Sequence, residues 1–178
     1  MSRVKLLDRE FELSISEEKL LKAVDQVAEK MNADLEGKNP LMVCVLNGSF
    51  MFASDLMKRL TIPCEISFVK LSSYSGTGST GKVKELIGLN EDISGRTIVL
   101  LEDIVDTGLT IINTVEQVKQ MRPADVKVAT MLFKPEACKH DVKLDYVGMD
   151  IPNDFIVGYG LDYDGYGRNL KDIYTVVE

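Results

Sequence analysis

Two short apolar runs constrain the fold of this chain more than any other feature of its sequence. Residues 41–46 carry no polar side chain, and residues 97–101 are apolar after an initial threonine. Such runs are typical of strands that are covered on both faces, as in a parallel sheet. Neighbouring parallel strands need a crossover connection, which is usually a helix. The runs therefore predict an α/β fold in which a central parallel sheet is flanked by helices.

Apolar side chains at helical spacing fill the intervals between the predicted strands. Phe52 and Leu56, for example, lie one helical turn apart. The first helix can be capped by Ser14 with Glu17, or by Ser16 itself. Helices are predicted over residues 16–31, 49–60 and 110–121. Further strands are predicted over residues 62–71, 125–132, 144–149 and 173–177.

Length and charge exclude several classes of protein. A chain of 178 residues suggests one domain, spanning 1–178, with a core that needs no disulfide or structural metal. The net charge of −7 and the absence of a long Lys/Arg run argue against nucleic-acid binding. No apolar run approaches the ~20 residues of a membrane span, and the first ten residues lack the apolar core of a signal peptide. We therefore expect a cytoplasmic protein without a membrane or nucleic-acid partner.

The cysteines and the single histidine narrow the possible chemistry. Cys44, Cys64 and Cys138 are widely spaced and do not form a disulfide framework. His140 lies in a polar stretch and is expected on the surface. A Ser-His-Asp triad and a His-rich zinc site are both disfavoured, because His140 would have to serve alone. Acid–base chemistry would then fall to carboxylates, lysines or tyrosines.

The segment richest in chemistry directly follows the second apolar run. It reads Glu-Asp-Ile-Val-Asp-Thr-Gly-Leu-Thr over residues 102–110 and leads into a predicted helix. The adjacent carboxylates of Glu102 and Asp103 suit sugar hydroxyls or a Mg²⁺ ion. Thr107 and Thr110, with the glycine between them, offer hydroxyls and N–H groups to a phosphate at the positive end of a helix. The segment itself is neither a Walker A loop nor a GxGxxG loop, and its combination of carboxylates with phosphate-binding groups suits a ribose 5-phosphate.

This pattern resembles the phosphoribosyl pyrophosphate (PRPP) motif of type I phosphoribosyltransferases. Further segments resemble, in the same order, those of the hypoxanthine/guanine phosphoribosyltransferases. These segments are a pyrophosphate turn at 46–52, a lid that starts at 71–74, a purine-contacting lysine at 133–135, a base-binding hood at 151–163, and residues 167–170. The resemblance implies a type I phosphoribosyltransferase fold, with a flexible lid loop near 72–85 and a small C-terminal hood near 151–178.

The resemblance also implies a reaction. It is the Mg²⁺-dependent transfer of the 5-phosphoribosyl group of PRPP to N9 of hypoxanthine and guanine, which gives IMP or GMP and pyrophosphate in purine salvage. Asp106 would act beside purine N7, and Glu102 and Asp103 would hold the ribose hydroxyls with Mg²⁺ nearby. The implied 5′-phosphate site is Asp106, Thr107, Gly108, Leu109 and Thr110.

The other implied residues contact the purine or the pyrophosphate. Lys134 would donate to purine O6, Phe155 would stack on the ring, and the Ile156 backbone would meet the Watson–Crick edge. Asp162 would border the purine and hold a second Mg²⁺ through the pyrophosphate. The implied pyrophosphate-binding residues are Asn47, Gly48 and Arg168, and the implied lid residues are Ser73 and Tyr74.

Asn47 departs from the family pattern, in which many relatives carry Lys or Arg at this position. Without that cation, contact with pyrophosphate falls to backbone N–H groups. In the family the peptide before this residue can be cis, and we predict that the Leu46–Asn47 bond can adopt this form. Leu109 also replaces a residue that is often Lys or Gly, with no obvious catalytic loss.

Three alternatives stay open. The first is a relative that prefers xanthine or guanine, because specificity depends on the pocket around Ile156 and Asp162. The second is a PRPP-sensing regulator that binds nucleic acid, which the charge of −7 disfavours. The third is a phosphate-binding module without enzymatic activity, which the ordered match of Asp106, Lys134 and Phe155 disfavours. The resemblance alone implies a homodimer or homotetramer.

Overall fold

The computed structural model describes residues 2–74 and 83–178. The helices are α1 (Glu17–Asp34), α2 (Phe50–Met57) and α3 (Leu109–Lys119). The larger sheet has the order β5-β4-β3-β6-β7-β8 and the smaller sheet the order β1-β2-β10-β9. Strands of the larger sheet are β3 (Leu41–Leu46), β4 (Glu65–Tyr74), β5 (Val83–Ile87), β6 (Thr97–Val105), β7 (Asp125–Phe133) and β8 (Tyr146–Asp150). Strands of the smaller sheet are β1 (Arg3–Leu6), β2 (Arg9–Ile15), β9 (Ile156–Val157) and β10 (Ile173–Val176).

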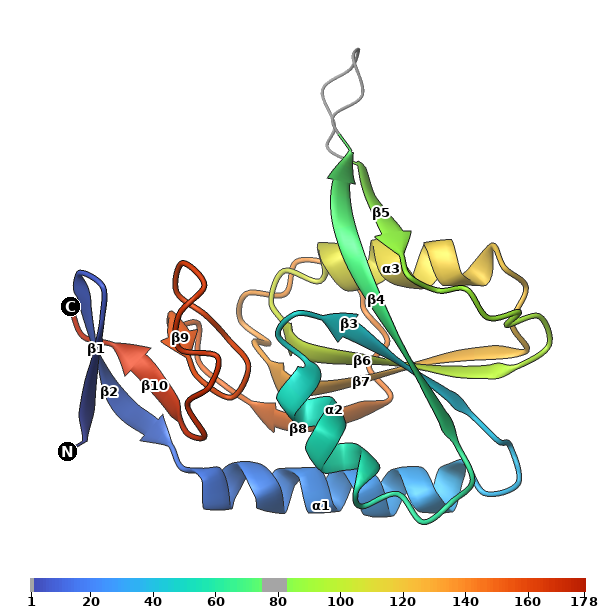
Figure 1. Cartoon of the computed structure of the whole chain (residues 1–178), viewed down its shortest axis with the longest axis horizontal. Coiled ribbons are helices and arrows are strands. Elements are labelled where there is room, and N and C mark those ends of the chain that lie inside the picture. Colours follow the sequence, from blue (N-terminus) through green and yellow to red (C-terminus); the bar gives the residue numbers. More distant parts are fainter. Residues whose placement is uncertain (1, 75–82) are drawn as a thin grey trace.

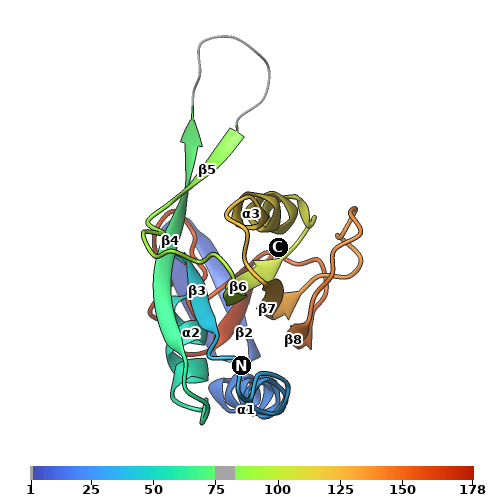
Figure 2. The ribbon, with the colours of Figure 1, turned by 90° about the vertical axis from the view of Figure 1, so that its right-hand side faces the viewer.

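The larger sheet is covered on both faces, as the apolar runs predict. Met42 and Cys44 of β3 belong to the core that α1 and α2 share, whereas Leu41 and Val43 belong to the core beneath α3. Figures 1 and 2 show α3 on one side of the sheet and α1 with α2 on the other. Five neighbouring strands are parallel, but β5 pairs antiparallel with β4 at the edge. The sheet is therefore mixed rather than purely parallel.

The predicted helices are present, with shifted ends. Ser16 is the N-cap of α1, and its hydroxyl accepts a hydrogen bond from the backbone N–H of Lys19 at 3.4 Å. α2 ends at Met57, three residues before the predicted end, although Leu60 still packs on the same core. None of the helices in the described parts of the chain combines the length and hydropathy that a membrane crossing needs.

The order of the strands creates a crevice at the carboxyl ends of the parallel strands in the larger sheet. β3 leads through α2 to β4 on one side, while β6 leads through α3 to β7 on the other. β3 and β6 are neighbours, so the loops that follow them diverge from adjacent strand ends. Ligands of open α/β sheets bind at such a point, outside the carboxyl ends of the strands.

The smaller sheet joins the two ends of the chain. The N-terminal hairpin, β1 and β2, pairs through β2 with β10, which in turn pairs with β9 (Figure 1). Phe11, Val157 and Tyr174 form its buried centre. The hood near 151–178 was predicted, but the strands of residues 3–15 were not, although apolar residues alternate with polar ones through Phe11, Leu13 and Ile15 in this region.

The predicted lid loop begins and ends as strand. β4 extends to Tyr74 and β5 starts at Val83, and these two residues are paired. The prediction of a loop over 72–74 and 83–85 is therefore wrong, because the backbones of these residues pair as an antiparallel extension of β4 and β5. Residues 75–82 of the predicted lid lie outside the described residues.

Candidate active site

The acidic pair lies within a strand rather than after it. β6 extends to Val105, so Glu102 and Asp103 belong to its last half. Alternation along the strand would point successive side chains to opposite faces. The backbone N–H of Ile104 donates to Oδ1 of Asp103 at 2.6 Å, and Glu102 is only 7% exposed. Both residues line a cavity of about 260 Å³ that continues along residues 104–108, 110 and 111.

The predicted phosphate loop, residues 106–110, lines this cavity with all of its residues except Leu109. Gly108 is the N-cap of α3 and has φ of 90°, a conformation that glycine adopts without steric cost. A Cβ at Gly108 would lie 2.6 Å from Cγ2 of Val142, so the loop packs closely on the segment behind it. The backbone N–H of Lys139 donates to the carbonyl of Thr107 at 3.1 Å. The positive end of α3 thus borders the cavity, a standard environment for a phosphate.

A column of close contacts through Gly48 and Gly160 joins the loop after β3 to both β6 and the hood (151–178). A Cβ at Gly48 would lie 1.6 Å from Oδ2 of Asp103, and a Cβ at Gly160 would lie 2.0 Å from the carbonyl oxygen of Gly48. Nη1 of Arg168 donates to the carbonyl of Gly160 at 2.7 Å. The peptide bond between Leu46 and Asn47 is cis, which confirms the prediction. Two of the predicted pyrophosphate residues, Gly48 and Arg168, therefore lie close to Asp103.

The surroundings of Asp103 in this column shift the pKa of its carboxyl group. Burial raises the pKa of Asp103 to about 6, and the charge of Asp162 also raises it, while Arg168 opposes the shift. Nη2 of Arg168 is 2.9 Å from Oδ1 of Asp162, whose other oxygen accepts a hydrogen bond from the N–H of Gly165 at 2.7 Å. These contacts fix the orientation of the guanidinium group of Arg168.

Lys134 connects the phosphate loop to the hood. It follows β7, is 7% exposed, and donates from Nζ to the carbonyl of Asp154 at 2.8 Å. The same Nζ is 3.6 Å from Oδ2 of Asp106, whose side chain is half-exposed. Phe155 is 44% exposed, and Ile156 follows it in β9. Lys134 thus contacts both the Asp106 carboxylate and the backbone of the residue that precedes Phe155.

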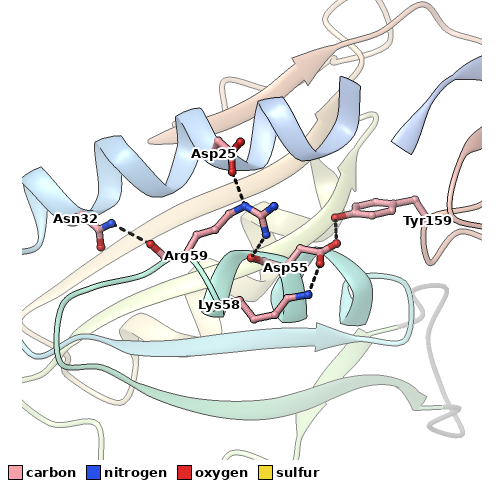
Figure 3. A network of polar contacts seen from close by, with 6 residues as sticks. All are labelled: Asp25, Asn32, Asp55, Lys58, Arg59 and Tyr159. Atoms are coloured by element: carbon pink, nitrogen blue, oxygen red, sulfur yellow. Dashed lines mark hydrogen bonds and ion pairs between the residues drawn. The ribbon is translucent and has the colours of Figure 1, made fainter. Parts of the chain in front are cut away.

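A polar network fixes the hood against the helices, and nothing in the sequence predicted it. The hydroxyl of Tyr159 donates to Oδ2 of Asp55 at 2.6 Å, and Lys58 is 2.8 Å from the other carboxylate oxygen (Figure 3). Arg59 joins α2 to α1 through Asp25. The network leads from α1 through α2 to the hood residue next to Gly160.

Comparison with known proteins decides the family. A model of the phosphoribosyl transferase domain matches residues 14–164. The chain belongs to the phosphoribosyltransferase family. A hypoxanthine-guanine phosphoribosyltransferase of Streptococcus agalactiae serotype V is 45% identical over 164 residues, which cover 92% of this chain and 91% of the relative. One from Streptococcus thermophilus (strain CNRZ 1066) is 40% identical, with the same coverage.

Solved structures show the same similarity in three dimensions. A hypoxanthine phosphoribosyltransferase from Staphylococcus aureus has a TM-score of 0.86 at 34% identity and covers 93% of this chain and 91% of its own. A hypoxanthine-guanine phosphoribosyltransferase from Bacillus anthracis has a TM-score of 0.86 at 37% identity, with coverage of 93% and 98%. The type I phosphoribosyltransferase fold is thereby confirmed.

The acidic residues of this phosphoribosyltransferase fit a metal ion that the substrate also holds. In the described parts of the chain, no three His, Cys, Asp or Glu side chains are grouped to bind a metal by themselves. Mg²⁺ usually takes one or two carboxylates, with substrate phosphates and waters as its other ligands. Glu102 and Asp103 line the cavity, and Asp162 lies beside Arg168. These carboxylates would suit Mg²⁺ with one or two protein ligands.

The two predicted lid residues, Ser73 and Tyr74, also lie near the carboxyl ends of the parallel strands. Ser73 and Tyr74 end β4, which runs parallel to β3. Their backbones therefore lie at the same end of the sheet as Asn47, which follows β3. The lid role assigned to them stays a prediction.

Proposed function

We propose that the protein catalyses the Mg²⁺-dependent transfer of the 5-phosphoribosyl group of PRPP to N9 of hypoxanthine and guanine, with release of pyrophosphate. The product would be IMP or GMP, which makes the reaction a step of purine salvage. The observation that carries the proposal is the 3.6 Å approach of Lys134 Nζ to Asp106 Oδ2, at the start of the phosphate loop. These two groups suit a 6-oxopurine, and Asp106 also lines the cavity that we assign to the ribose 5-phosphate. The names of the relatives at 40–45% identity support the same reaction.

Asp106 and Lys134 act on the purine in this proposal. As N9 bonds to C1 of the ribose and the bond from C1 to pyrophosphate breaks, the purine gains positive charge. The carboxylate of Asp106 lies beside N7 and takes its proton or stabilises its charge. Lys134 donates to O6, which favours an oxopurine over a purine with an amino group at this position. Phe155 stacks on the ring, and the backbone of Ile156 meets its polar edge.

Other groups hold the PRPP. The phosphate loop, including Thr107, Leu109 and Thr110, binds the 5′-phosphate through N–H groups and hydroxyls. Glu102 and Asp103 would hold the ribose hydroxyls with one Mg²⁺ nearby, and Asp162 would hold a second Mg²⁺ through the pyrophosphate. Bound Mg²⁺ would supply positive charge to the leaving pyrophosphate. Arg168 and the backbone at Asn47 and Gly48 bind the pyrophosphate.

Two further parts of the proposal concern the surroundings of the site. Ser73 and Tyr74 belong to a lid that keeps water from the ribose while C1 carries positive charge. The chain works in the cytoplasm as one domain, in a homodimer or homotetramer. Phe68 and Ile87, large apolar side chains that are exposed on β4 and β5, support self-association. Sedimentation that finds an active monomer alone would contradict the oligomer.

A single assay tests the proposed reaction. Purified protein is mixed with PRPP, Mg²⁺ and one of hypoxanthine, guanine or xanthine, and nucleotide formation is followed. We expect turnover with hypoxanthine and guanine and its loss when Mg²⁺ is chelated. Preferential turnover of xanthine would favour the xanthine-preferring alternative. No turnover with any base would favour a PRPP-binding regulator.

A further inference from the structure

Phe155, the proposed purine-stacking residue, belongs to a cluster of three aromatic rings. Its ring centroid is 5.9 Å from that of Tyr163 in an edge-on arrangement of 82°, and 6.2 Å from that of Phe11. The rings of Phe11 and Tyr163 are 5.9 Å apart. Phe11 is fully buried, whereas Phe155 keeps 44% of its surface exposed. The two neighbours therefore set the angle at which the free part of the Phe155 ring is presented.

Tyr163 is held from outside the hood by the turn of the N-terminal hairpin. Its hydroxyl donates to Oδ1 of Asp8 at 2.8 Å, and the guanidinium carbon of Arg9 lies 5.3 Å from the centroid of its ring. The bond from Tyr163 keeps the pKa of Asp8 below its ordinary value, so the acceptor is a carboxylate at neutral pH. A hydrogen bond to an ionised group is stronger than one between neutral groups. One turn thus fixes Tyr163 by its edge and by its face.

The hairpin is itself registered against the strands that follow Phe155. Val176 of β10 pairs with Phe11 of β2, and its N–H donates to the carbonyl of Phe155 at 3.0 Å. A Cβ at Gly167 would lie 2.8 Å from Cδ1 of Leu6, which shows how closely β1 packs on the loop that follows Tyr163. The hairpin is therefore linked directly to the two segments that carry Phe155 and Tyr163.

We propose that Tyr163 is a positioning residue for the purine, and that Asp8 and Arg9 of the N-terminal hairpin hold it there. The inference rests on the proposed function, because it assigns to the hairpin the orientation of the ring that stacks on the base. Aromatic pairs prefer defined edge-to-face geometries, so a displaced Tyr163 would turn Phe155 away from the purine. The phosphate loop has no part in this contact, so the effect should be confined to the base.

Kinetics with two substrates test the inference. Tyr163→Phe removes the hydrogen bond and keeps the ring, and Asp8→Ala removes the acceptor. Each variant should raise KM for hypoxanthine and guanine by about threefold to tenfold, the range expected for one hydrogen bond, and leave KM for PRPP unchanged. The double variant should lose no more than either single variant, because both remove one bond. Asp8→Asn keeps an acceptor oxygen and should restore most of the purine affinity.

The matched control is Tyr166→Phe, in the same loop, because Tyr166 is 59% exposed. It should change neither KM. A merely structural role of Tyr163 would lower the melting temperature and kcat while leaving the ratio of the two KM values unchanged, and that result would overturn the inference. Unchanged purine KM in both Tyr163→Phe and Asp8→Ala would also overturn it. If the wild-type protein turned over no purine at all, the proposed function would fail first, and the inference with it.

Discussion

The two sides of the candidate site are built in opposite ways. The phosphate side is one continuous segment, residues 102–110, that runs from the last part of β6 into the first turn of α3. The purine side is assembled from Lys134 after β7, from Phe155 in the hood, and from a hairpin near the start of the chain. A local segment carries its chemistry in its own sequence, whereas an assembled wall depends on residues that never touch a substrate. Substitutions should therefore act locally on the first side and remotely on the second.

The largest effect is expected from Asp106→Asn, on the phosphate side. The variant keeps the shape of the loop but loses the carboxylate that faces Lys134, so kcat should fall by about 10²- to 10⁴-fold, the usual contribution of general acid–base catalysis. KM for PRPP should change little. Pre-steady-state measurement of the chemical step would check this, and a variant with full kcat when chemistry limits the rate would remove Asp106 from its role.

Gly48→Ala tests the point at which the two sides meet. The added methyl would occupy the place of the Asp103 carboxylate, 1.6 Å from its Oδ2. A displacement of about 1 Å at a reacting centre costs on the order of 100-fold in rate, and we expect kcat/KM to fall by that amount. Gly95→Ala is the control for activity: a Cβ there meets no atom within 4 Å, and Gly95 precedes β6 at the end away from Asp103, so the strain of an alanine at its φ of 70° should lower stability but not kcat/KM. Equal activity of both variants would show that the column does not align the site.

Asp103→Asn should separate stability from activity on the phosphate side. The folded-state pKa of about 6 lies above the ordinary 3.8, so the folded protein binds more protons than the unfolded chain between these values. The contribution of Asp103 to stability therefore falls as pH rises through this window. The variant should unfold with about 1–3 kcal/mol more free energy than wild type near pH 7.5, and with a smaller difference near pH 5.

Urea titrations in Mg²⁺-free buffer at the two pH values measure this difference, and activity should fall in the same variant. A gain in stability that is independent of pH would contradict the assignment of the effect to a buried charge.

The smallest effect is expected from Tyr159→Phe, on the purine side. The change removes the hydrogen bond to Asp55, which keeps its ion pair with Lys58, so the free energy of unfolding should fall by about 1–2 kcal/mol. Affinity for ribose 5-phosphate, which needs the phosphate side alone, should stay the same in calorimetry. Loss of that affinity would mean that the two sides are not separable in the way their construction indicates.

The phosphate side was the most predictable part of the molecule. The order of residues over 102–110 predicted a carboxylate pair and a phosphate cradle, and the residues of this segment other than Leu109 line one cavity. The strand over 41–46 and the cap at Ser16 were also predicted, because an apolar run and a hydroxyl before a helix are local signals. The end of β6 was misplaced, since Glu102 and Asp103 were expected after the strand.

The purine side could be predicted only through family resemblance, and its supports could not be predicted at all. The contact between Gly48 and Gly160 joins two backbones and leaves no pattern of side chains in the sequence. The bond from Tyr163 to Asp8 spans 155 positions, a separation that periodicity cannot detect. The strand at Arg9–Ile15 has alternating residues, but a strand of mainly charged residues is a weak signal without its neighbour.

The pairing of β2 with β10 also bears on how the protein is made. β2 ends at Ile15, whereas β10 begins at Ile173. At usual rates of synthesis, β2 leaves the ribosome on the order of 10–30 s before its neighbour. During that interval the nascent chain can complete α3 and the strands beside it, while the first hairpin still has an open edge. A newly synthesised chain should thus be able to bind a sugar phosphate before it can bind a purine base.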